Sequence, residues 1–377
     1  MTSPAPTSPL IDTLVVGAGP AGIGMALALS DVDELLLGVV ERGQVGETFR
    51  RWPASQRFLT PSFTGNGFGA TDLNAVHPKT SPAFSLGLDY PNGVEYARYL
   101  GGVVRHFNVP VMSETEVTGV MRGPDGFAVT TSRGAVQART LVWAGGEFHD
   151  PQQPRFAGGV LADHSSTEFA WSRRDGRVVV IGGYESGIDI ACYHVELGAD
   201  VTVIDPEHPW DAGQGSDPSF RLAPRSRQKM ANALATGRLT LTAQARVTAI
   251  KPGPDGTFLV SMGGAGKVSS DSRPILATGF GTGLGPVAAL FDRRHDGWPL
   301  LDDNDESTTN PGLFLSGPAM RHGSLKFCFV YKFRQRFAHV ARTIGERLEK
   351  DCSKLGAWAE AGMLTDDLSC CGVECEC

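Results

Sequence analysis

The sequence has 377 residues and a net charge of −7, and 47 residues, about 12%, are glycine against roughly 7% in average usage. Hydrophobic residues make up 41% and charged residues 20%, which excludes a disordered or collagen-like chain. The length predicts about two domains. The acidic balance argues against nucleic acid or an anionic membrane as partner, and no apolar run of about 18 residues predicts a membrane span. We expect a cytoplasmic protein.

Near the N-terminus, a strand pattern runs into a glycine-rich turn and an apolar helix, and a second strand ends on an acid. The segments are, in chain order, residues 12–16, the glycines Gly17, Gly19 and Gly22, residues 23–30, residues 35–40 and Glu41. This order is typical of a dinucleotide-binding unit. The glycines let the backbone approach a pyrophosphate at the helix N-terminus, and the acid accepts hydrogen bonds from a ribose.

A second unit of the same kind follows in the middle of the chain. Its segments are residues 177–181, the turn residues Gly182, Gly183, Ser186 and Gly187, a helix that ends near residue 197, residues 200–204 and Asp205. The pattern is degenerate, because Tyr184 stands where the second glycine of the turn is expected. Two such units in one chain imply a flavin and a nicotinamide, with a hydride passing between them.

The acid of the second unit favours NADH over NADPH. Asp205 can pair with a free 2′-hydroxyl and would repel a 2′-phosphate, and Pro206 rather than an arginine follows it. Three basic residues in the following segment keep NADPH open; they are Arg221, Arg225 and Arg227.

Two hairpin-rich stretches, residues 117–139 and 239–268, connect these units, and each is followed by a strand and a turn of small residues. A further strand and turn ends at Gly317, and a closing helix runs from about residue 333 to 350. We predict an α/β fold with two Rossmann-like three-layer ββα domains. The predicted limits are residues 1–160 and 275–350 for an FAD domain, 161–274 for an inserted NAD(P) domain, and 351–377 for a flexible Cys-rich tail.

This layout resembles the flavoproteins with two dinucleotide-binding domains, which include thioredoxin reductase-like enzymes and flavin-containing monooxygenases. Within that group the stretch from residue 46 to 61, with Trp52 and Thr60, is similar to a run beside the flavin in bacterial monooxygenase-like members, and residues 277–279 match an Ala-Thr-Gly motif at a domain crossover. The resemblance implies FAD at the first turn and a nicotinamide at the second. We assign to the cofactors, in addition, Pro20, Ala21, Arg42, Arg51, Trp52, Val117, Ala144, Gly145, Asp205, Thr278, Gly279 and Gly317, and we place Thr60 near the flavin.

Several residues depart from the patterns of these families. Thioredoxin reductases carry a Cys-x-x-Cys before the second turn, and residues 164–180 contain no cysteine. Pro318 follows Gly317 where an aspartate is expected, and the monooxygenase signature is matched only loosely, because His164 lies two positions late. Thioredoxin reductase itself is therefore disfavoured, and a disulfide-reductase branch without that motif stays open.

The last eight residues contain four cysteines: Cys370, Cys371, Cys375 and Cys377. Thiolates are soft ligands for thiophilic ions, and they also exchange disulfides. The residues before and within the first pair resemble the C-terminal end of mercuric reductases, which implies metal delivery to a flavin site. We assign all four as metal ligands and Cys370 and Cys371 as catalytic in redox or metal delivery; an inert tail is the alternative.

Together these observations predict an FAD- and NAD(P)H-dependent monooxygenase that oxygenates a soft nucleophile, either sulfur or trivalent arsenic or antimony. One alternative is a thiol-disulfide or metal(loid) reductase that uses the C-terminal cysteines. A second alternative is a non-enzymatic metal-binding or redox-sensing flavoprotein. The expected partner is a small-molecule or metal(loid) substrate, and formation of a homodimer stays open.

Overall fold

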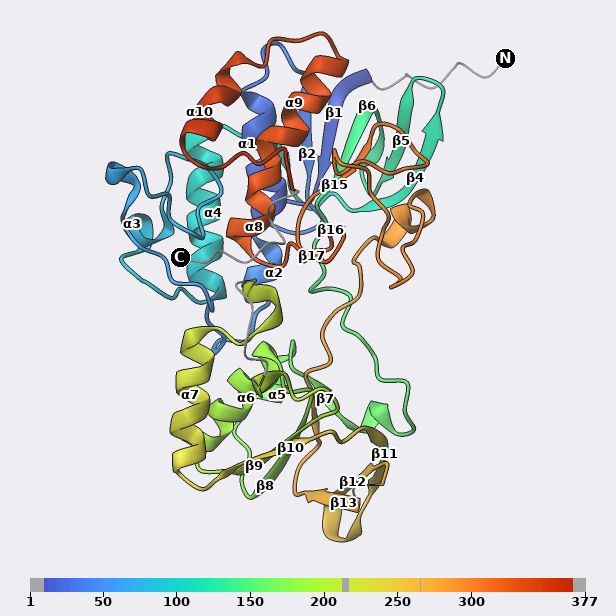
Figure 1. The fold of residues 1–377 in the computed structure, drawn as a ribbon. Helices are drawn as coiled ribbons and strands as arrows, with labels where there is room; N and C mark the ends of the chain where they lie inside the picture. The colour runs from blue at the N-terminus through green and yellow to red at the C-terminus, as the bar shows by residue number, and fades with distance from the viewer. Residues whose placement is uncertain (1–9, 212–216, 265, 369–377) are drawn as a thin grey trace. The chain divides into compact units, whose positions relative to one another are not determined.

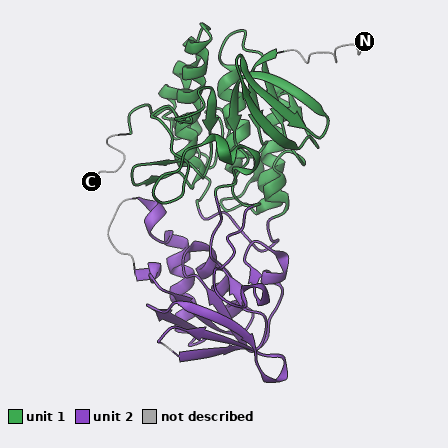
Figure 2. Ribbon diagram, turned by 90° about the vertical axis from the view of Figure 1, so that its right-hand side faces the viewer, with its two compact units in different colours: residues 1–51, 60–149, 282–373 green, residues 52–59, 150–281, 374–377 purple. Residues whose placement is uncertain are grey.

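A computed structural model describes residues 10–211, 217–264 and 266–368, which form two compact units (Figure 2). Within these ranges, unit 1 comprises residues 10–51, 60–149 and 282–368, and unit 2 comprises residues 52–59 and 150–281. The central segment of unit 2 therefore runs from residue 150 to 281. The sequence predicted residues 161–274 for the inserted domain. None of the described helices has the length and apolar character needed to cross a membrane.

Unit 1 is built on a sheet with the strand order β3-β2-β1-β6-β5-β4, and β15 pairs with β6. β6 belongs to two arrangements: its first half pairs antiparallel with β5, and its second half lies between the parallel strands β1 and β15. The strands are β1 (Leu10–Val16), β2 (Leu37–Val40), β3 (Val111–Met112), β4 (Val117–Gly123), β5 (Gly126–Thr131), β6 (Gly134–Trp143), β15 (Leu313–Leu315), and the hairpin β16 (Arg321–His322) and β17 (Leu325–Lys326).

Helices α1, α4 and α9 lie on one side of the parallel strands of unit 1 (Figure 1). α1 is apolar on all sides and nearly every residue is buried, as expected for a helix enclosed between a sheet and a second helix. Its contact with α9 is so close that a Cβ on Gly24 would lie 2.0 Å from the ring of Phe337. The helices of unit 1 are α1 (Pro20–Ser30), α2 (Glu47–Arg50), α3 (Pro82–Leu86), α4 (Gly93–Phe107), α8 (Val330–Phe333), α9 (Phe337–Arg347) and α10 (Gly356–Glu360).

Unit 2 contains a parallel sheet of order β10-β9-β8-β14-β7 and a separate antiparallel meander, β11-β12-β13. Its strands are β7 (Asp163–His164), β8 (Arg177–Ile181), β9 (Asp200–Asp205), β10 (Leu239–Ala243), β11 (Val247–Pro252), β12 (Phe258–Met262), β13 (Gly266–Ser270) and β14 (Ile275–Leu276). Its helices are α5 (Glu168–Trp171), α6 (Glu185–Glu196) and α7 (Pro224–Ala235).

Side chains of β8 alternate between two cores of unit 2, because successive residues of a strand point to opposite faces. Val178 and Val180 pack in the cluster that includes residues of α6. Val179 and Ile181 pack in the cluster that includes residues of β11 and β12. The sheet is therefore covered by helices on one face and by the antiparallel meander on the other. The predicted α/β class, with a three-layer ββα arrangement, is confirmed.

Residues 351–368, which we expected to belong to a flexible tail, contain α10 and bury three side chains in unit 1. Leu355, Trp358 and Met363 are at most 1% exposed. The indole N–H of Trp358 also donates to Asp31 at 2.8 Å, just after the end of α1. A buried tryptophan ties this segment to the core, whereas its sequence shows no regular apolar period.

Candidate functional site

The first glycine turn connects β1 to α1. At two of its positions the backbone packs so closely that only glycine, which has no Cβ, fits. Gly17 has φ +107°, and a Cβ there would lie 2.4 Å from the carbonyl oxygen of Ala144. A Cβ on Gly22 would lie 1.8 Å from the carbonyl oxygen of Gly17. The start of α1 is therefore held directly against the end of β1 and of β6. Its first turn carries no acidic residue, so its free N–H groups can donate hydrogen bonds to an anion.

Glu41, at the carboxyl end of β2, is hydrogen-bonded to the backbone of this turn. The backbone N–H of Ala18 donates to one carboxylate oxygen at 2.7 Å, and that of Gly43 donates to the other at 2.8 Å. A carboxylate offers about four acceptor positions, so about two stay available for ribose hydroxyls.

The end of β15 carries a buried hydroxyl that has no partner in the described part of the chain. Ser316 Oγ is buried and makes no hydrogen bond there. The next residue, Gly317, has φ +115° and approaches α1, since a Cβ would lie 3.2 Å from Ala21 Cβ. A Cβ on Gly19, by contrast, would have no heavy atom within 4 Å. An unsatisfied hydroxyl next to a glycine that approaches the first turn of α1, together with an open glycine at the N-terminus of that helix, fits a bound dinucleotide.

Other residues assigned to the flavin lie around this turn in unit 1. Gly145 follows Ala144 directly and lies against the indole of Trp143. Val117 begins β4, and nearby the N–H of Thr115 donates to the Glu41 carbonyl at 2.8 Å. The remaining assigned side chains of unit 1 are more peripheral: Arg42 is exposed, Arg51 pairs with Glu47 at 3.0 Å, and Thr60 accepts from Asn74 through its carbonyl.

Trp52, which we also assigned to the flavin, belongs to unit 2 rather than to unit 1. Its ring packs against Phe58 with 5.4 Å between centroids. The stretch from residue 46 to 61 is thus divided between the two units.

The second glycine turn, in unit 2, repeats the backbone geometry of the first. Gly182 has φ +104°, and a Cβ there would lie 2.3 Å from the Ala277 carbonyl oxygen. A Cβ on Gly187 would lie 1.9 Å from the Gly182 carbonyl oxygen. The N–H of Gly183 donates to Asp205 at 2.7 Å, as Ala18 donates to Glu41 in unit 1.

The second turn differs from the first in its side chains. The hydroxyl of Tyr184 donates to the carbonyls of Pro218 and Arg221, at 3.2 and 3.0 Å. Trp210 covers Gly183, since a Cβ on that glycine would lie 2.2 Å from the indole. Glu185, in the first turn of α6, is buried, and burial raises the pKa of its carboxyl while Ser226 and Ala223 donate to it. This turn therefore offers an anion less open space than the first.

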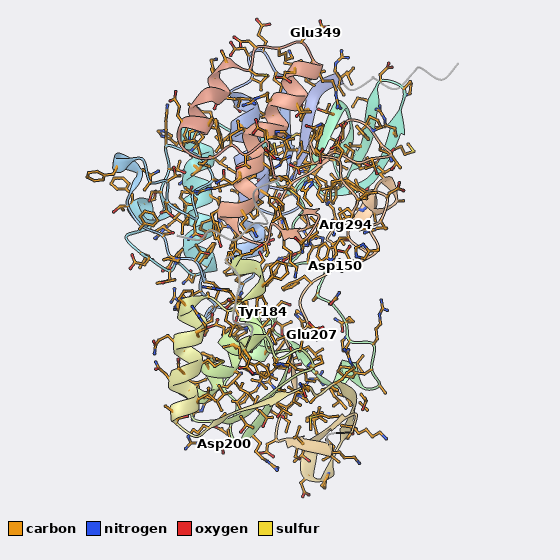
Figure 3. All side chains as sticks on the ribbon, viewed as in Figure 1. Asp150, Tyr184, Asp200, Glu207, Arg294 and Glu349 are labelled. Carbon is orange, nitrogen blue, oxygen red and sulfur yellow. The ribbon has the colours of Figure 1, made fainter. Side chains whose placement is uncertain are left out.

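The carboxylate of Asp205 accepts more backbone hydrogen bonds than that of Glu41. Its Oδ1 accepts the N–H groups of Glu207 and His208, at 2.7 and 3.0 Å, and its Oδ2 accepts that of Gly183. Figure 3 shows Tyr184 and Glu207 at one end of the unit 2 sheet and Asp200 at the other. About one acceptor position of Asp205 stays free for a ribose.

Three further assigned residues lie near the second turn. Ser186 is exposed on α6. The hydroxyl of Thr278 donates to the Gln152 carbonyl at 2.9 Å, and the Gly279 carbonyl lies 3.1 Å from His164 Nε2. Because Nδ1 of His164 also lies 2.8 Å from Ser166 Oγ, both ring nitrogens serve structural bonds.

Sequence reasoning missed Glu147, which follows the Gly145-Gly146 turn at the end of β6. Burial raises the pKa of its carboxyl to about 7, and the charge of Arg321 opposes that rise. Its position directly after a predicted strand and turn was the available signal. Arg321 lies in β16, and no sequence pattern connects it to Glu147.

The four cysteines of the tail, Cys370, Cys371, Cys375 and Cys377, lie outside the described residues. The described cysteines are the buried Cys192, the exposed Cys328 and the partly buried Cys352, and none is disulfide-bonded. No group of three or more His, Cys, Asp or Glu residues that would hold a metal ion occurs in the described ranges.

A family model described as pyridine nucleotide-disulphide oxidoreductase matches residues 14–317, which include both turns. The chain belongs to this family. It is therefore an oxidoreductase, which replaces the non-enzymatic interpretation. The family and the geometry of the two turns support FAD and a pyridine nucleotide as cofactors of this oxidoreductase.

The chain is similar to the uncharacterised oxidoreductase CzcO of Bacillus velezensis, with 30% identity over 201 residues, 51% of this chain and 53% of that protein. The match thus spans about half the length of that relative. Two solved structures share the fold of this oxidoreductase. Bacillithiol disulfide reductase Bdr of Staphylococcus aureus has TM-score 0.72 and 19% identity over 90% of this chain and 99% of its own. A flavin-containing monooxygenase of Stenotrophomonas maltophilia has TM-score 0.69 and 18% identity over the same shares.

We expect Glu147→Gln to stabilise this oxidoreductase at pH 8 and to leave its stability near pH 4 unchanged. The folded-state pKa of about 7 exceeds the ordinary value of 4.5, so folding takes up a proton between them. Wild-type stability therefore falls as the pH rises from about 4.5 to 7, and glutamine removes that loss, with a gain of about 1–2 kcal/mol after allowance for partial exposure.

Urea unfolding at the two pH values measures this difference, with the exposed Glu360→Gln as control. A Glu147→Gln protein less stable than the wild type at pH 8 would show that the carboxyl is not desolvated.

Proposed function

We propose that unit 1 binds FAD, that unit 2 binds NADH, and that the chain is a flavin monooxygenase acting on a soft nucleophile. The observation that carries the proposal is the first turn: Gly19 is open, Ser316 Oγ has no partner among the described residues, and Glu41 keeps free acceptor positions. A small-molecule or metal(loid) substrate and a cytoplasmic location are parts of this proposal.

The residues of unit 1 would hold the cofactor in a defined way. The N-terminus of α1 would face the pyrophosphate, and the remaining acceptor positions of Glu41 would take the ribose hydroxyls. Ser316 would donate its hydroxyl to a cofactor oxygen. When bound there, FAD would supply two-electron chemistry, namely acceptance of a hydride from the nicotinamide and activation of O₂ for oxygen transfer to a soft nucleophile such as sulfur or trivalent arsenic or antimony.

A second candidate is a thiol-disulfide or metal(loid) reductase that uses Cys370 and Cys371. The likeness in fold to a bacillithiol disulfide reductase favours it. Of the described cysteines, Cys328 is exposed. Cys192 and Cys352 are poorly suited to disulfide exchange, because Cys192 is buried, with a pKa raised to about 12 mainly by burial, and burial also raises the pKa of Cys352. Neither offers a ready thiolate for disulfide exchange.

The deciding experiment follows NADH oxidation by the purified, flavin-loaded protein with and without oxygen, together with transfer of ¹⁸O from ¹⁸O₂ to a thioether or arsenite. We expect oxygen-dependent turnover and labelled product. Fast anaerobic turnover with a disulfide, abolished in Cys370→Ser/Cys371→Ser, would overturn the monooxygenase proposal and establish the reductase.

Ser316→Ala should weaken FAD binding by about two- to tenfold, because a net hydrogen bond contributes about 0.5–1.5 kcal/mol. The unfolding free energy of the protein without FAD should stay equal or rise, since the hydroxyl has no partner in the described part of the chain. Titration with FAD and urea unfolding test the two expectations separately. Unchanged FAD affinity in a well-folded variant would exclude Ser316 from the site.

Asp205→Asn should raise the ratio of kcat/KM for NADPH to that for NADH by about five- to tenfold. The substitution removes a charge that repels a 2′-phosphate. The one remaining oxygen of the side chain can accept the N–H groups of Glu207 and His208, whereas the N–H of Gly183 loses its acceptor. Asp200→Asn, at the opposite end of β9, is the matched control and should leave the ratio unchanged. A protein that prefers NADPH before substitution would contradict the NADH proposal.

A further inference from the structure

Arg334 is a buried arginine of unit 1 that forms no ion pair with any described residue. It is the first residue of the 3₁₀ turn η7 (Arg334–Arg336), which lies between α8 and α9, and it is 4% exposed. Buried charges are normally paired, and the neighbouring Arg336 follows that rule through its bond to Asp305 at 2.8 Å. An unpaired guanidinium at such depth indicates a group that meets the negative charge of a ligand.

The hydrogen bonds of Arg334 to described residues come from a single nitrogen of its guanidinium. Nη1 donates to the carbonyl of Asp72, and to that of Ala75 at 3.1 Å. Nε is buried and has no hydrogen-bond partner in the described ranges. The edge that Nε shares with Nη2 therefore keeps its N–H groups for another acceptor. Two parallel N–H groups on one edge match the paired oxygens of a carboxylate or a phosphate.

The carboxylate of Asp72 is engaged elsewhere, although the carbonyl of that residue accepts from Arg334. Asp72 is fully buried, and its carboxylate accepts the hydroxyl of Ser81 at 2.7 Å and the N–H groups of Asn74 and Ala83 at 3.0 and 3.1 Å. These three bonds use most of the acceptor positions of the carboxylate. Burial lowers the pKa of Arg334 and the charge of Asp72 opposes that shift, but the two side chains form no ion pair.

The loop that holds Arg334, residues 72–76, is fixed by bonds within unit 1. Tyr96 on α4 donates its hydroxyl to the Asn74 carbonyl at 2.7 Å. The side-chain amide of Asn74 donates in turn to the Thr60 carbonyl at 2.9 Å. The loop thus connects Arg334 with Thr60, which the sequence analysis placed near the flavin. A guanidinium held in this way loses little conformational freedom when it binds an anion.

The packing of α9 on α1 places Arg334 beside the first turn of α1. A Cβ on Gly24 would lie 2.0 Å from the ring of Phe337. Further along, a Cβ on Gly345 would lie 2.9 Å from Val32. Both segments advance by eight residues between these contacts, so they run parallel and in step. Three residues back, the same register sets Arg334 level with the first turn of α1, and η7 does contact α1. That turn carries the free N–H groups expected to bind the pyrophosphate of a dinucleotide.

We propose that the free edge of Arg334 binds the pyrophosphate of FAD. The N–H groups at the N-terminus of α1 and this guanidinium then act on the same anion, the first through the helix dipole and the second through a full positive charge. The inference rests on the proposed binding of FAD by unit 1 but not on the choice between a monooxygenase and a reductase.

The first test titrates the flavin-free protein with FAD at several salt concentrations. In Arg334→Gln the Kd should rise about 10- to 100-fold, as for loss of a charge-assisted pair of hydrogen bonds, and should depend less on salt than in the wild type. Arg334→Lys should recover part of the affinity, because it restores the charge without the paired N–H groups. The matched control is Arg342→Gln, which removes a partly exposed charge of α9 that lies 3.6 Å from Asp366 and should leave the Kd unchanged.

A second measurement distinguishes the pyrophosphate from the flavin ring. The pyrophosphate carries the same charge in oxidised and reduced FAD, so the midpoint potential of bound FAD should be equal in the wild type and in Arg334→Lys. A shifted potential in that variant, with unchanged affinity for oxidised FAD, would place the arginine at the ring and overturn the proposal.

Two further results would also overturn it: wild-type FAD affinity in a folded Arg334→Gln protein, or an equal loss of affinity in Arg342→Gln. If circular dichroism shows that Arg334→Gln does not fold, wild-type affinity in Arg334→Lys carries the same meaning. A wild-type protein that binds no FAD would instead overturn the proposed function of unit 1.

Discussion

The contact between a helix and the backbone of the turn before it is the constraint on which both units depend. Gly22 and Gly187 each bring their helix within van der Waals contact of a carbonyl oxygen in the preceding turn, where no side chain fits. A second contact, from Gly17 or Gly182 to the next parallel strand, fixes the turn against β6 or β14. These contacts determine where the strand ends, the free N–H groups and the acids Glu41 and Asp205 lie.

The same backbone carries two sites of different character. The first turn presents an open glycine and an acid with spare acceptor positions. In the second turn, Tyr184 and Trp210 fill space near the backbone, and Glu185 is buried at the start of the helix. Asp205 accepts the N–H of Gly183 in the turn and two N–H groups, of Glu207 and His208, in the following loop. This difference supports the proposal that unit 1 binds FAD and unit 2 binds the nicotinamide.

Charges in unit 1 fall into two groups. Two ion pairs, Asp305 with Arg336 and Glu306 with Arg347, connect the residues before β15 to the two ends of α9. Glu147 and Arg321 are not bonded to each other, and Arg321 is held by carbonyls and an indole instead. Pairing gives the first group a structural role, whereas burial raises the pKa of the Glu147 carboxyl to about 7.

The sequence alone determined the α/β class, the two glycine turns and their acids, because these features depend on neighbouring residues and on a period that the chain displays directly. It did not reveal Ser316 or Glu147 as candidate site residues, nor the buried Trp358 in a segment that we expected to be flexible. Ser316 and Arg321 lie about 170 residues from the Gly145-Gly146 turn in the chain. They become buried only when β6, β15 and β16 come together in the fold. Desolvation depends on the whole surrounding fold, so only the tertiary structure decided which carboxyl is poised to titrate near neutral pH.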